Sequence, residues 1–235
     1  MSAAIRQAVD LNLVLLHPLP LDGSIWPVGL WGLADAVHAP TLYGAGGSLT
    51  AWAATALADI PAGPCVVVGN SVGGSCALEL THLAPQRVRA LVLIGAKAGA
   101  RPDPAFREEA IRLIQDEGID AAWDRYWGPL FALDCDQAVV EAAKAIAQGL
   151  PVNHIVNGVR AFHTRPDRAT LLASLDIPVT IVRGEHDRIP KDPELLVSTL
   201  HRGAFIEVGG AGHYVPIERP SAVVSIVRDV INRVT

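Results

Sequence analysis

Short runs of Val, Ile and Leu recur along the chain, and each is followed by a glycine-containing turn and a segment of helical length. This alternation is typical of a parallel sheet covered by helices on both faces, because strands buried on both sides are apolar throughout. It predicts an α/β domain of about six mostly parallel strands. The strands are expected at 11–16, 38–43, 65–68, 90–94, 179–183 and 205–208, and the helices near 25–36, 49–60, 72–83, 193–200 and 221–234.

The interval 101–176 interrupts this alternation of strands and helices. It contains several amphipathic segments of helical length in succession, with no strand pattern between them. Asp103, which precedes a proline, and Asp136 are typical residues for a helix start. The interval is therefore predicted to be a helical cap, inserted into a core that is formed by residues 1–100 and 177–235.

The strongest signal for chemistry is the segment 69–74, GNSVGG, which follows an apolar run and precedes a helical segment. A serine at a tight turn from strand to helix needs small neighbours, and Gly69 and Gly73 let the backbone take a strained conformation there. Ser71 is thus the candidate nucleophile. The backbone amide of Val72, at the start of the helix, is a candidate donor to an oxyanion. An ordinary glycine-rich turn is the alternative, which the flanking strand and helix disfavour.

A serine hydroxyl needs a histidine base and an orienting carboxylate, both expected at the carboxyl ends of later strands. The strand at 179–183 is followed by Gly-Glu-His and then Asp187, and the strand at 205–208 is followed by a glycine-rich loop that ends at His213. Asp187 is the expected acid because it begins the turn into the next loop, and Glu185 is the second choice. The order Ser, Asp, His along the chain fits a hydrolase with this type of turn.

The first predicted strand runs into the sequence HPLPLDG at positions 17–23. An oxyanion hole needs a second backbone amide from such a loop. Pro18 and Pro20 have no N–H, so Leu19 is the expected donor. The alternative is a plain turn stiffened by two prolines, but the place directly after the first core strand favours the functional interpretation.

Taken in order, these motifs resemble those of the α/β-hydrolase superfamily, and among its members the small bacterial esterases and 3-oxoadipate enol-lactonase-like enzymes. The resemblance extends over almost the whole chain. It includes a His and a later Trp, matched by His17 and Trp26, which it places next to the substrate. Two features depart from the family pattern: Pro18 stands where Gly is usual, and too few residues precede position 11 for the antiparallel hairpin that usually opens the fold.

The resemblance implies a serine hydrolase that cleaves a small ester, thioester or lactone through an acyl-serine intermediate. A carbon–carbon bond hydrolase keeps the same serine and is one alternative. A ligand receptor on the same fold, with slow turnover or none, is another, and a measured turnover discriminates between them. Because the shortened sheet leaves an edge less protected, the protein is expected to be a monomer or a homodimer.

Two groups of residues in the predicted cap are candidates for substrate contact. The aromatic residues of the segment 123–131 follow helical spacing, which usually indicates packing, and Trp127 is the one assigned to the pocket as well. Arg160 and Arg165 lie near the end of the cap, where an arginine can pair with a substrate carboxylate. An arginine that is simply solvated is the equally supported alternative.

Composition and motifs exclude several classes of partner and cofactor. The net charge of −5 and the lack of clustered Lys and Arg argue against nucleic acid. No apolar run is long enough for a membrane span, and the first residues do not resemble a secretory signal, so a cytoplasmic protein with no membrane partner is expected. The three cysteines have no paired spacing and are expected to be free thiols. No metal-binding motif occurs, so the prediction is a small-molecule substrate with neither metal nor cofactor.

Overall fold

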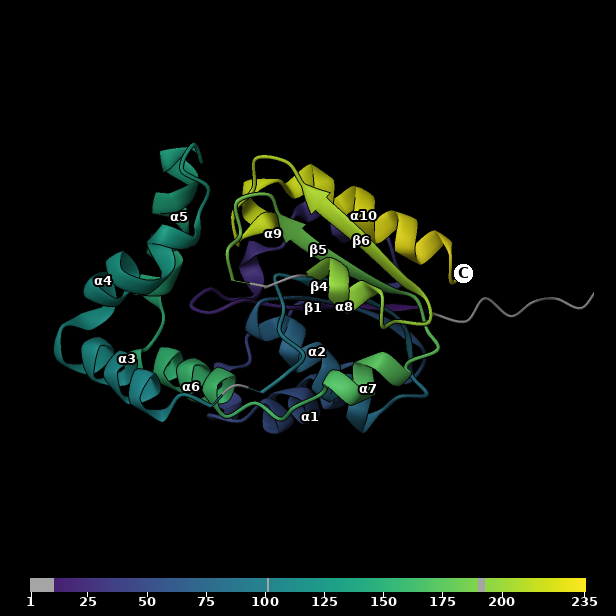
Figure 1. The fold of residues 1–235 in the computed structure, drawn as a ribbon, viewed down its shortest axis with the longest axis horizontal. Helices are drawn as coiled ribbons and strands as arrows, with labels where there is room; N and C mark the ends of the chain where they lie inside the picture. Colours follow the sequence, from purple (N-terminus) through teal and green to yellow (C-terminus); the bar gives the residue numbers. More distant parts are fainter. Residues whose placement is uncertain (1–10, 101, 190–192) are drawn as a thin grey trace, which may run out of the picture.

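The computed structural model of the protein describes residues 11–100, 102–189 and 193–235. Within them, six strands form one sheet in the order β2-β1-β3-β4-β5-β6, and every pairing is parallel (Figure 1). The predicted α/β architecture is confirmed. The strands are β1 (Asn12–Leu16), β2 (Ala36–His38), β3 (Cys65–Asn70), β4 (Val88–Ile94), β5 (Val179–Gly184) and β6 (Gly203–Val208).

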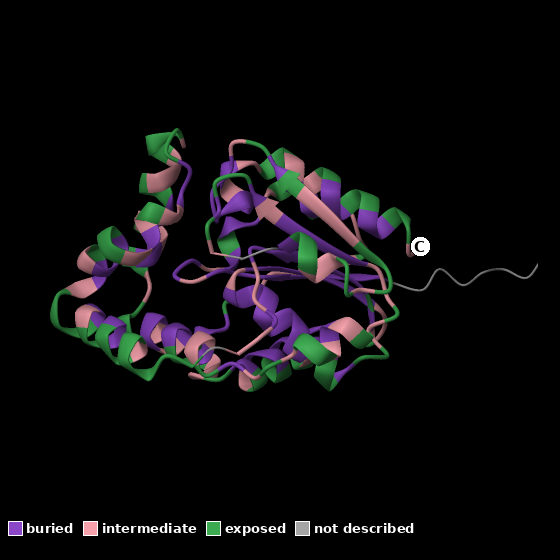
Figure 2. Ribbon diagram, viewed as in Figure 1, coloured by how far each residue is buried: buried purple, intermediate pink, exposed green. Residues whose placement is uncertain are grey.

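Helices cover both faces of the sheet, and α1 and α2 lie on one side with α10 on the other (Figure 1). The inner strands β1 and β3 are buried along their whole length, as expected from the runs of Leu and Val at their centres (Figure 2). The helices of the core are α1 (Leu49–Asp59), α2 (Val72–Leu83), α8 (Pro193–Val197), α9 (Val215–Glu218) and α10 (Pro220–Asn232), with the 3₁₀ turns η1 (Gly23–Ile25), η2 (Val28–Leu30) and η3 (Tyr43–Ala45).

The chain between β4 and β5 is helical, as the sequence predicts, and its helices α3 to α6 lie beyond the carboxyl ends of the strands (Figure 1). Asp103 and Asp136 cap two of them, because their carboxylates accept hydrogen bonds from Phe106 N–H and Ala138 N–H. The elements are α3 (Pro104–Asp116), α4 (Gly118–Ala122), the π-helical turn η4 (Trp123–Trp127), the 3₁₀ turn η5 (Gly128–Leu130), α5 (Gln137–Gly149), α6 (Val152–His163) and α7 (Ala169–Ser174).

The last inserted helix, α7, packs against the core, where it contacts α2 (Figure 1). The boundaries of a separate cap at 101 and 176 therefore stay a prediction, and residue 101 itself lies outside the described residues.

One predicted helix is wrong. The segment 25–36 contains no continuous helix but the 3₁₀ turns η1 and η2, after which strand β2 begins. Pro27 lies between the two turns, and a proline there has no N–H to donate and blocks a helix that would run through it. The strand expected at 38–43 lies earlier in the chain, since β2 spans Ala36–His38 and shares only His38 with the expected range.

A buried ion pair fixes the start of α7 to the core. Arg168 donates from Nε to Glu79 Oε2 at 2.8 Å and from Nη2 to Glu79 Oε1 at 3.2 Å, and Thr50 Oγ1 donates to the same carboxylate at 2.8 Å. Only 2% of the Glu79 side chain is exposed. A charge with so little water around it depends on its protein partners for stabilisation.

Arg168→Ala is therefore expected to lower the free energy of unfolding by about 3 kcal/mol, since it leaves the Glu79 carboxylate buried without its cation. Urea unfolding followed by circular dichroism measures the change. The matched control is Arg107→Ala, which breaks a partly exposed pair with Glu108 and is expected to cost less than about 1 kcal/mol. Equal losses for the two variants would contradict the interpretation of the Arg168 pair as a buried anchor.

Candidate active site

Ser71 lies at the turn between β3 and α2, with φ 56° and ψ −118°. It is the one non-glycine residue with positive φ among those that the structure describes, and such a conformation is costly for a residue with a side chain. The backbone can turn this sharply because a Cβ at Gly69 would overlap Gly73, and one at Gly73 would overlap Leu16. The glycines that predicted the turn are thus required by close backbone approaches.

His213 and Asp187 form the polar pair expected from the sequence. His213 Nδ1 lies 2.8 Å from Asp187 Oδ2, and both side chains are almost completely buried. The other carboxylate oxygen of Asp187 accepts a hydrogen bond from Ile189 N–H at 2.9 Å. Glu185, the alternative acid, is exposed and accepts from Gly210 N–H instead. The geometry thus joins His213 to Asp187, and its Nε2 remains for the cavity.

Gly95, directly after β4, permits this pair to sit close to the backbone. Its φ is +56°, and a Cβ built there would lie 2.9 Å from Asp187 Oδ2 and from two atoms of the His213 ring. Sequence reasoning missed this position. The signal was a glycine immediately after a core strand, which often marks a close approach of backbone to another group.

Two buried polar side chains hold the loop that carries His213. Asn70, the last residue of β3, donates from Nδ2 to the His213 carbonyl at 3.1 Å and to the Ile94 carbonyl at 3.0 Å. Glu218 accepts from Gly212 N–H at 2.9 Å and from Tyr214 N–H at 3.0 Å, on either side of His213. The histidine backbone is therefore fixed from both the sheet and α9.

The same loop is connected to the inserted segment. Glu218 Oε2 also accepts from Ala132 N–H at 2.9 Å, and His213 N–H donates to the Leu130 carbonyl at 2.8 Å. These bonds tie the turn after η5 to the histidine loop. The wall of the site and the position of His213 are consequently coupled through one backbone hydrogen bond and through the side chain of Glu218.

Two backbone amides were expected to bind an oxyanion, those of Leu19 and Val72. Both residues line the cavity that contains Ser71. Val72 is the first residue of α2, where an N–H has no acceptor within the helix. Tyr214 Oη donates to the Leu19 carbonyl at 3.1 Å and so fixes the neighbouring peptide. The arrangement is suited to stabilising negative charge beside Ser71.

His17 has a supporting position and does not line the cavity. Its Nε2 accepts from Leu42 N–H at 3.0 Å, and its Nδ1 lies 3.2 Å from the Pro18 carbonyl. Complete burial lowers the pKa of His17 to about 4, so the ring is neutral near pH 7. The histidine thus braces the loop that carries Leu19, whereas the resemblance placed it next to the substrate.

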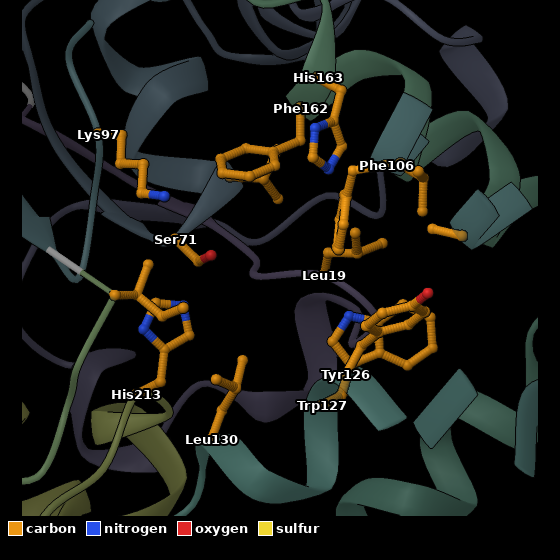
Figure 3. Close-up of a pocket in the computed structure, with 14 residues that line it drawn as sticks. Leu19, Ser71, Lys97, Phe106, Tyr126, Trp127, Leu130, Phe162, His163 and His213 are labelled. Atoms are coloured by element: carbon orange, nitrogen blue, oxygen red, sulfur yellow. The ribbon is translucent and has the colours of Figure 1, made fainter. Parts of the chain in front are cut away.

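A cavity of about 220 Å³ opens above Ser71 and His213 (Figure 3). Its walls are mostly apolar and come from the loop after β1 and from the inserted helices. Trp127, which the sequence assigned to substrate contact, lies in this wall, and the contact itself stays a prediction. The apolar and aromatic residues labelled in the close-up are Leu19, Phe106, Tyr126, Trp127, Leu130 and Phe162.

The other expected contacts lie elsewhere. Trp26 is buried in the core and is not among the residues that line the cavity. Arg165 is buried behind Phe162, with Nε donating to the Gly99 carbonyl at 3.0 Å and its guanidinium 4.4 Å from the Phe162 ring centroid. Arg160 is exposed, and its side-chain carbons pack near Gly47. Neither arginine faces Ser71.

The polar side chains that line the cavity beside Ser71 and His213 are those of Lys97 and His163, in place of the two arginines expected from the sequence (Figure 3). Burial, together with the positive charges of Arg165 and Lys97, lowers the pKa of His163 to about 4. His163 is therefore a neutral hydrogen-bonding group near pH 7. Nothing in the sequence marked Lys97, because it lies in a loop with no recognisable motif.

The cysteines are free, and none of the three lines this cavity. Burial raises the pKa of Cys65 to about 11 and raises the pKa of Cys76 as well, which makes both thiols poor nucleophiles. In the described part of the chain, no cluster of three or more His, Cys, Asp or Glu side chains is arranged to hold a metal ion. None of the described helices combines the length and apolar character needed to cross a membrane.

Comparison with known proteins shows the family to which the chain belongs. Residues 13–226 match the sequence model of the alpha/beta hydrolase family. The chain belongs to this family. A curated esterase of Mycobacterium tuberculosis is 27% identical to this chain, over 94% of this chain and 83% of that protein. A pimeloyl-acyl-carrier-protein methyl ester esterase of Aromatoleum aromaticum is 38% identical over a shorter stretch, which covers 36% of this chain and 36% of that protein.

Solved structures show the same fold. A thermophilic esterase from Thermogutta terrifontis, with malate bound, superposes with a TM-score of 0.83 at 23% identity, over 96% of this chain and 91% of that chain. The enol-lactonase from Burkholderia xenovorans also superposes with a TM-score of 0.83, at 18% identity, over 97% of this chain and 93% of that chain. The likeness spans the strands and the inserted helices alike.

Proposed function

We propose that this protein is a serine hydrolase that cleaves small carboxylic esters, including thioesters or lactones, through an acyl-serine intermediate. The observation that carries the proposal is the position of Ser71, at a strained turn and in one cavity with a histidine that is bonded to a buried aspartate. Two curated relatives support it, since the proteins of Mycobacterium tuberculosis and Aromatoleum aromaticum described above are both named as esterases.

The chemistry follows from the hydrogen bonds of His213. In the neutral imidazole, a proton on Nδ1 that is donated to Asp187 leaves Nε2 without one, and Nε2 can then accept the proton of Ser71 Oγ. The serine oxygen attacks the ester carbonyl carbon, and the amides of Leu19 and Val72 stabilise the resulting oxyanion. Collapse of this intermediate expels the alcohol, which takes its proton from His213 and leaves the acyl group on Ser71.

In the second half of the reaction, water takes the place of the serine hydroxyl as the nucleophile, and Ser71 becomes the leaving group. His213 removes a proton from water, the hydroxide attacks the acyl carbon, and the collapse returns a proton to Ser71 and releases the acid. In this scheme the side chains of the protein perform every proton transfer, so neither a metal nor a cofactor is required. Asp187 keeps its negative charge throughout and stabilises the imidazolium that forms in each half.

The size of the cavity leads to a prediction about the acyl group. A volume of about 220 Å³ under a wall of inserted helices accommodates a short acyl chain or a compact lactone. Across a series of p-nitrophenyl esters from acetyl to palmitoyl, kcat/KM is expected to be highest for short chains and to fall by at least about tenfold toward palmitoyl. Steady-state kinetics on this series, with Ser71→Ala as the background control, is the test.

Two outcomes of the same series count against the proposal. A kcat/KM that rises toward the longest chains would overturn the assignment of small substrates. No turnover of any ester or lactone above the Ser71→Ala background would instead favour a ligand receptor on the same fold.

A further inference from the structure

Aromatic side chains are concentrated in the wall of the cavity above Ser71. Phe, Trp and Tyr make up only 5% of the sequence, yet four of the 14 residues that line the cavity are of these types, and a histidine adds a fifth ring. The rings come from three separate elements: Phe106 from α3, Tyr126 and Trp127 from η4, and Phe162 and His163 from α6 (Figure 3). These five residues are called the aromatic wall below.

The five rings form an unbroken series of contacts. The ring centroids of Trp127 and Tyr126 lie 6.4 Å apart, and those of Tyr126 and Phe106 lie 5.4 Å apart. The series continues from Phe106 to His163 and from His163 to Phe162, with the centroids 5.2 Å apart in both pairs. Three of the four pairs are T-shaped, so that the positive edge of one ring meets the negative face of the next. A further aromatic ring can continue this arrangement.

The aromatic wall is not closed by packing within the protein. Aromatic residues at helical spacing usually belong to a core, where other side chains cover them. Here 39% of Phe106 is exposed, and Tyr126, Phe162 and His163 are only partly buried. Apolar surface that stays open inside a concave site is typical of a ligand pocket.

His163 contributes to the wall as an uncharged ring. Burial, followed by the positive charges of Arg165 and Lys97, lowers its pKa to about 4, so the imidazole is neutral near pH 7. Its ring lies between those of Phe106 and Phe162 in the series. The imidazole therefore extends the aromatic wall without adding a full charge to it.

We infer that the substrate of this site carries a single aromatic ring, which packs against the aromatic wall while the ester carbonyl lies at Ser71. The inference rests on the proposed function and adds the class of substrate, namely esters of arylmethyl alcohols or of arylacetic acids. A cavity of about 150 Å³ is enough to hold benzene in another protein. The cavity here has a volume of about 220 Å³, which leaves room for an ester group beside one ring. The residues of the aromatic wall are then specificity-determining residues.

The test compares benzyl acetate with cyclohexylmethyl acetate, two esters that share one carbon skeleton and differ in whether the ring is aromatic. In Phe106→Leu the ratio of their kcat/KM values, benzyl over cyclohexylmethyl, is expected to fall about three- to tenfold, the size of one lost aromatic pair. Leucine keeps an apolar side chain at this position, so the ratio isolates the contact between rings. The matched control is Phe205→Leu on β6, whose ring lies outside the cavity and which should leave the ratio within about 1.5-fold.

Two variants of His163 distinguish an aromatic contact from a hydrogen bond. His163→Phe keeps a ring and removes both nitrogens, so it is expected to keep most of the ratio, whereas His163→Leu is expected to lower it about threefold. A second pair of esters, methyl phenylacetate and methyl cyclohexylacetate, places the ring on the acyl side.

The inference is supported if the aromatic-to-saturated ratio falls in Phe106→Leu for either pair of esters and is kept in His163→Phe. It is overturned if the ratio is unchanged in Phe106→Leu for both pairs, or if His163→Phe and His163→Leu lower it equally. Either of these last results, in a wild-type enzyme that hydrolyses the esters, leaves the proposed function intact.

A binding measurement separates this inference from the proposed function. Calorimetry with benzyl alcohol and with cyclohexylmethanol is carried out on Ser71→Ala and on the double variant Ser71→Ala, Phe106→Leu, and it does not depend on turnover. The preference for benzyl alcohol, expressed as the ratio of the two Kd values, is expected to fall about three- to tenfold in the double variant. If it falls while the wild type hydrolyses no ester, the aromatic subsite stands and the proposed hydrolase function fails. If the preference is equal in both variants, the aromatic subsite fails.

Discussion

Ser71→Ala is expected to lower kcat/KM for the preferred short ester by on the order of 10³-fold or more, and His213→Ala is expected to lower it comparably. Without the serine oxygen no acyl-enzyme forms, and without the imidazole nothing accepts the serine proton. Steady-state hydrolysis of the best ester in the acyl series measures both losses. The residual rate should come from binding and the two backbone amides alone.

The two losses are not expected to add, because nucleophile and base act as one unit. The variant with both Ser71→Ala and His213→Ala should be about as slow as either single variant. Alanine keeps the Cβ at the strained turn and adds no bulk, so the thermal midpoint of Ser71→Ala serves as the control for folding. A double variant whose loss is the product of the single losses would show that the two residues act independently.

Asp187→Asn is the second change with a large expected effect, a loss in kcat on the order of 10³-fold or more. The carboxylate accepts the Nδ1 proton of His213, and an amide there can donate in its place and stabilise the tautomer in which the nitrogen that faces Ser71 carries the proton. The kcat for the preferred ester is the measurement. His213 in the wrong tautomer cannot act as a base.

Glu185→Gln is the matched control for Asp187→Asn, two positions away in the same loop. Glu185 is exposed and accepts a hydrogen bond from Gly210 N–H, which the amide oxygen of glutamine can also accept. Its kcat is expected to stay within about threefold of the wild type. A larger loss for Glu185→Gln than for Asp187→Asn would mean that the acid is wrongly assigned.

The parts of the fold that the sequence predicts well are those fixed by local chemistry. The turn at Ser71 needs glycines at 69 and 73 because backbone atoms pack against them, so the requirement is visible in the sequence itself. The strands are likewise apparent as apolar runs, since both faces of this sheet are covered. By contrast, Ile25, Trp26 and Leu30 on either side of Pro27 are buried without forming a continuous helix, and helical spacing alone misled the prediction there.

The wall of the cavity is the part that the sequence does not predict. Lys97 and His163 are brought to Ser71 by the packing of α3 and α6 and by the anchored loop after β4, which are contacts between distant segments. Arg165 resembles a substrate-binding residue in the sequence, yet its guanidinium donates hydrogen bonds to the Gly99 and Phe162 carbonyls. The role of Glu218 in fixing the histidine loop is equally hidden, because its three amide partners come from two separate loops.

The formation of a covalent bond between Ser71 and the acyl group is tested by intact-protein mass spectrometry after treatment with a fluorophosphonate. Fluorophosphonates react with serines that an adjacent base activates. One adduct per chain is expected, which peptide sequencing maps to Ser71, and which is absent in Ser71→Ala and forms much more slowly in His213→Ala. An adduct on another residue, or labelling that persists in Ser71→Ala, would contradict it.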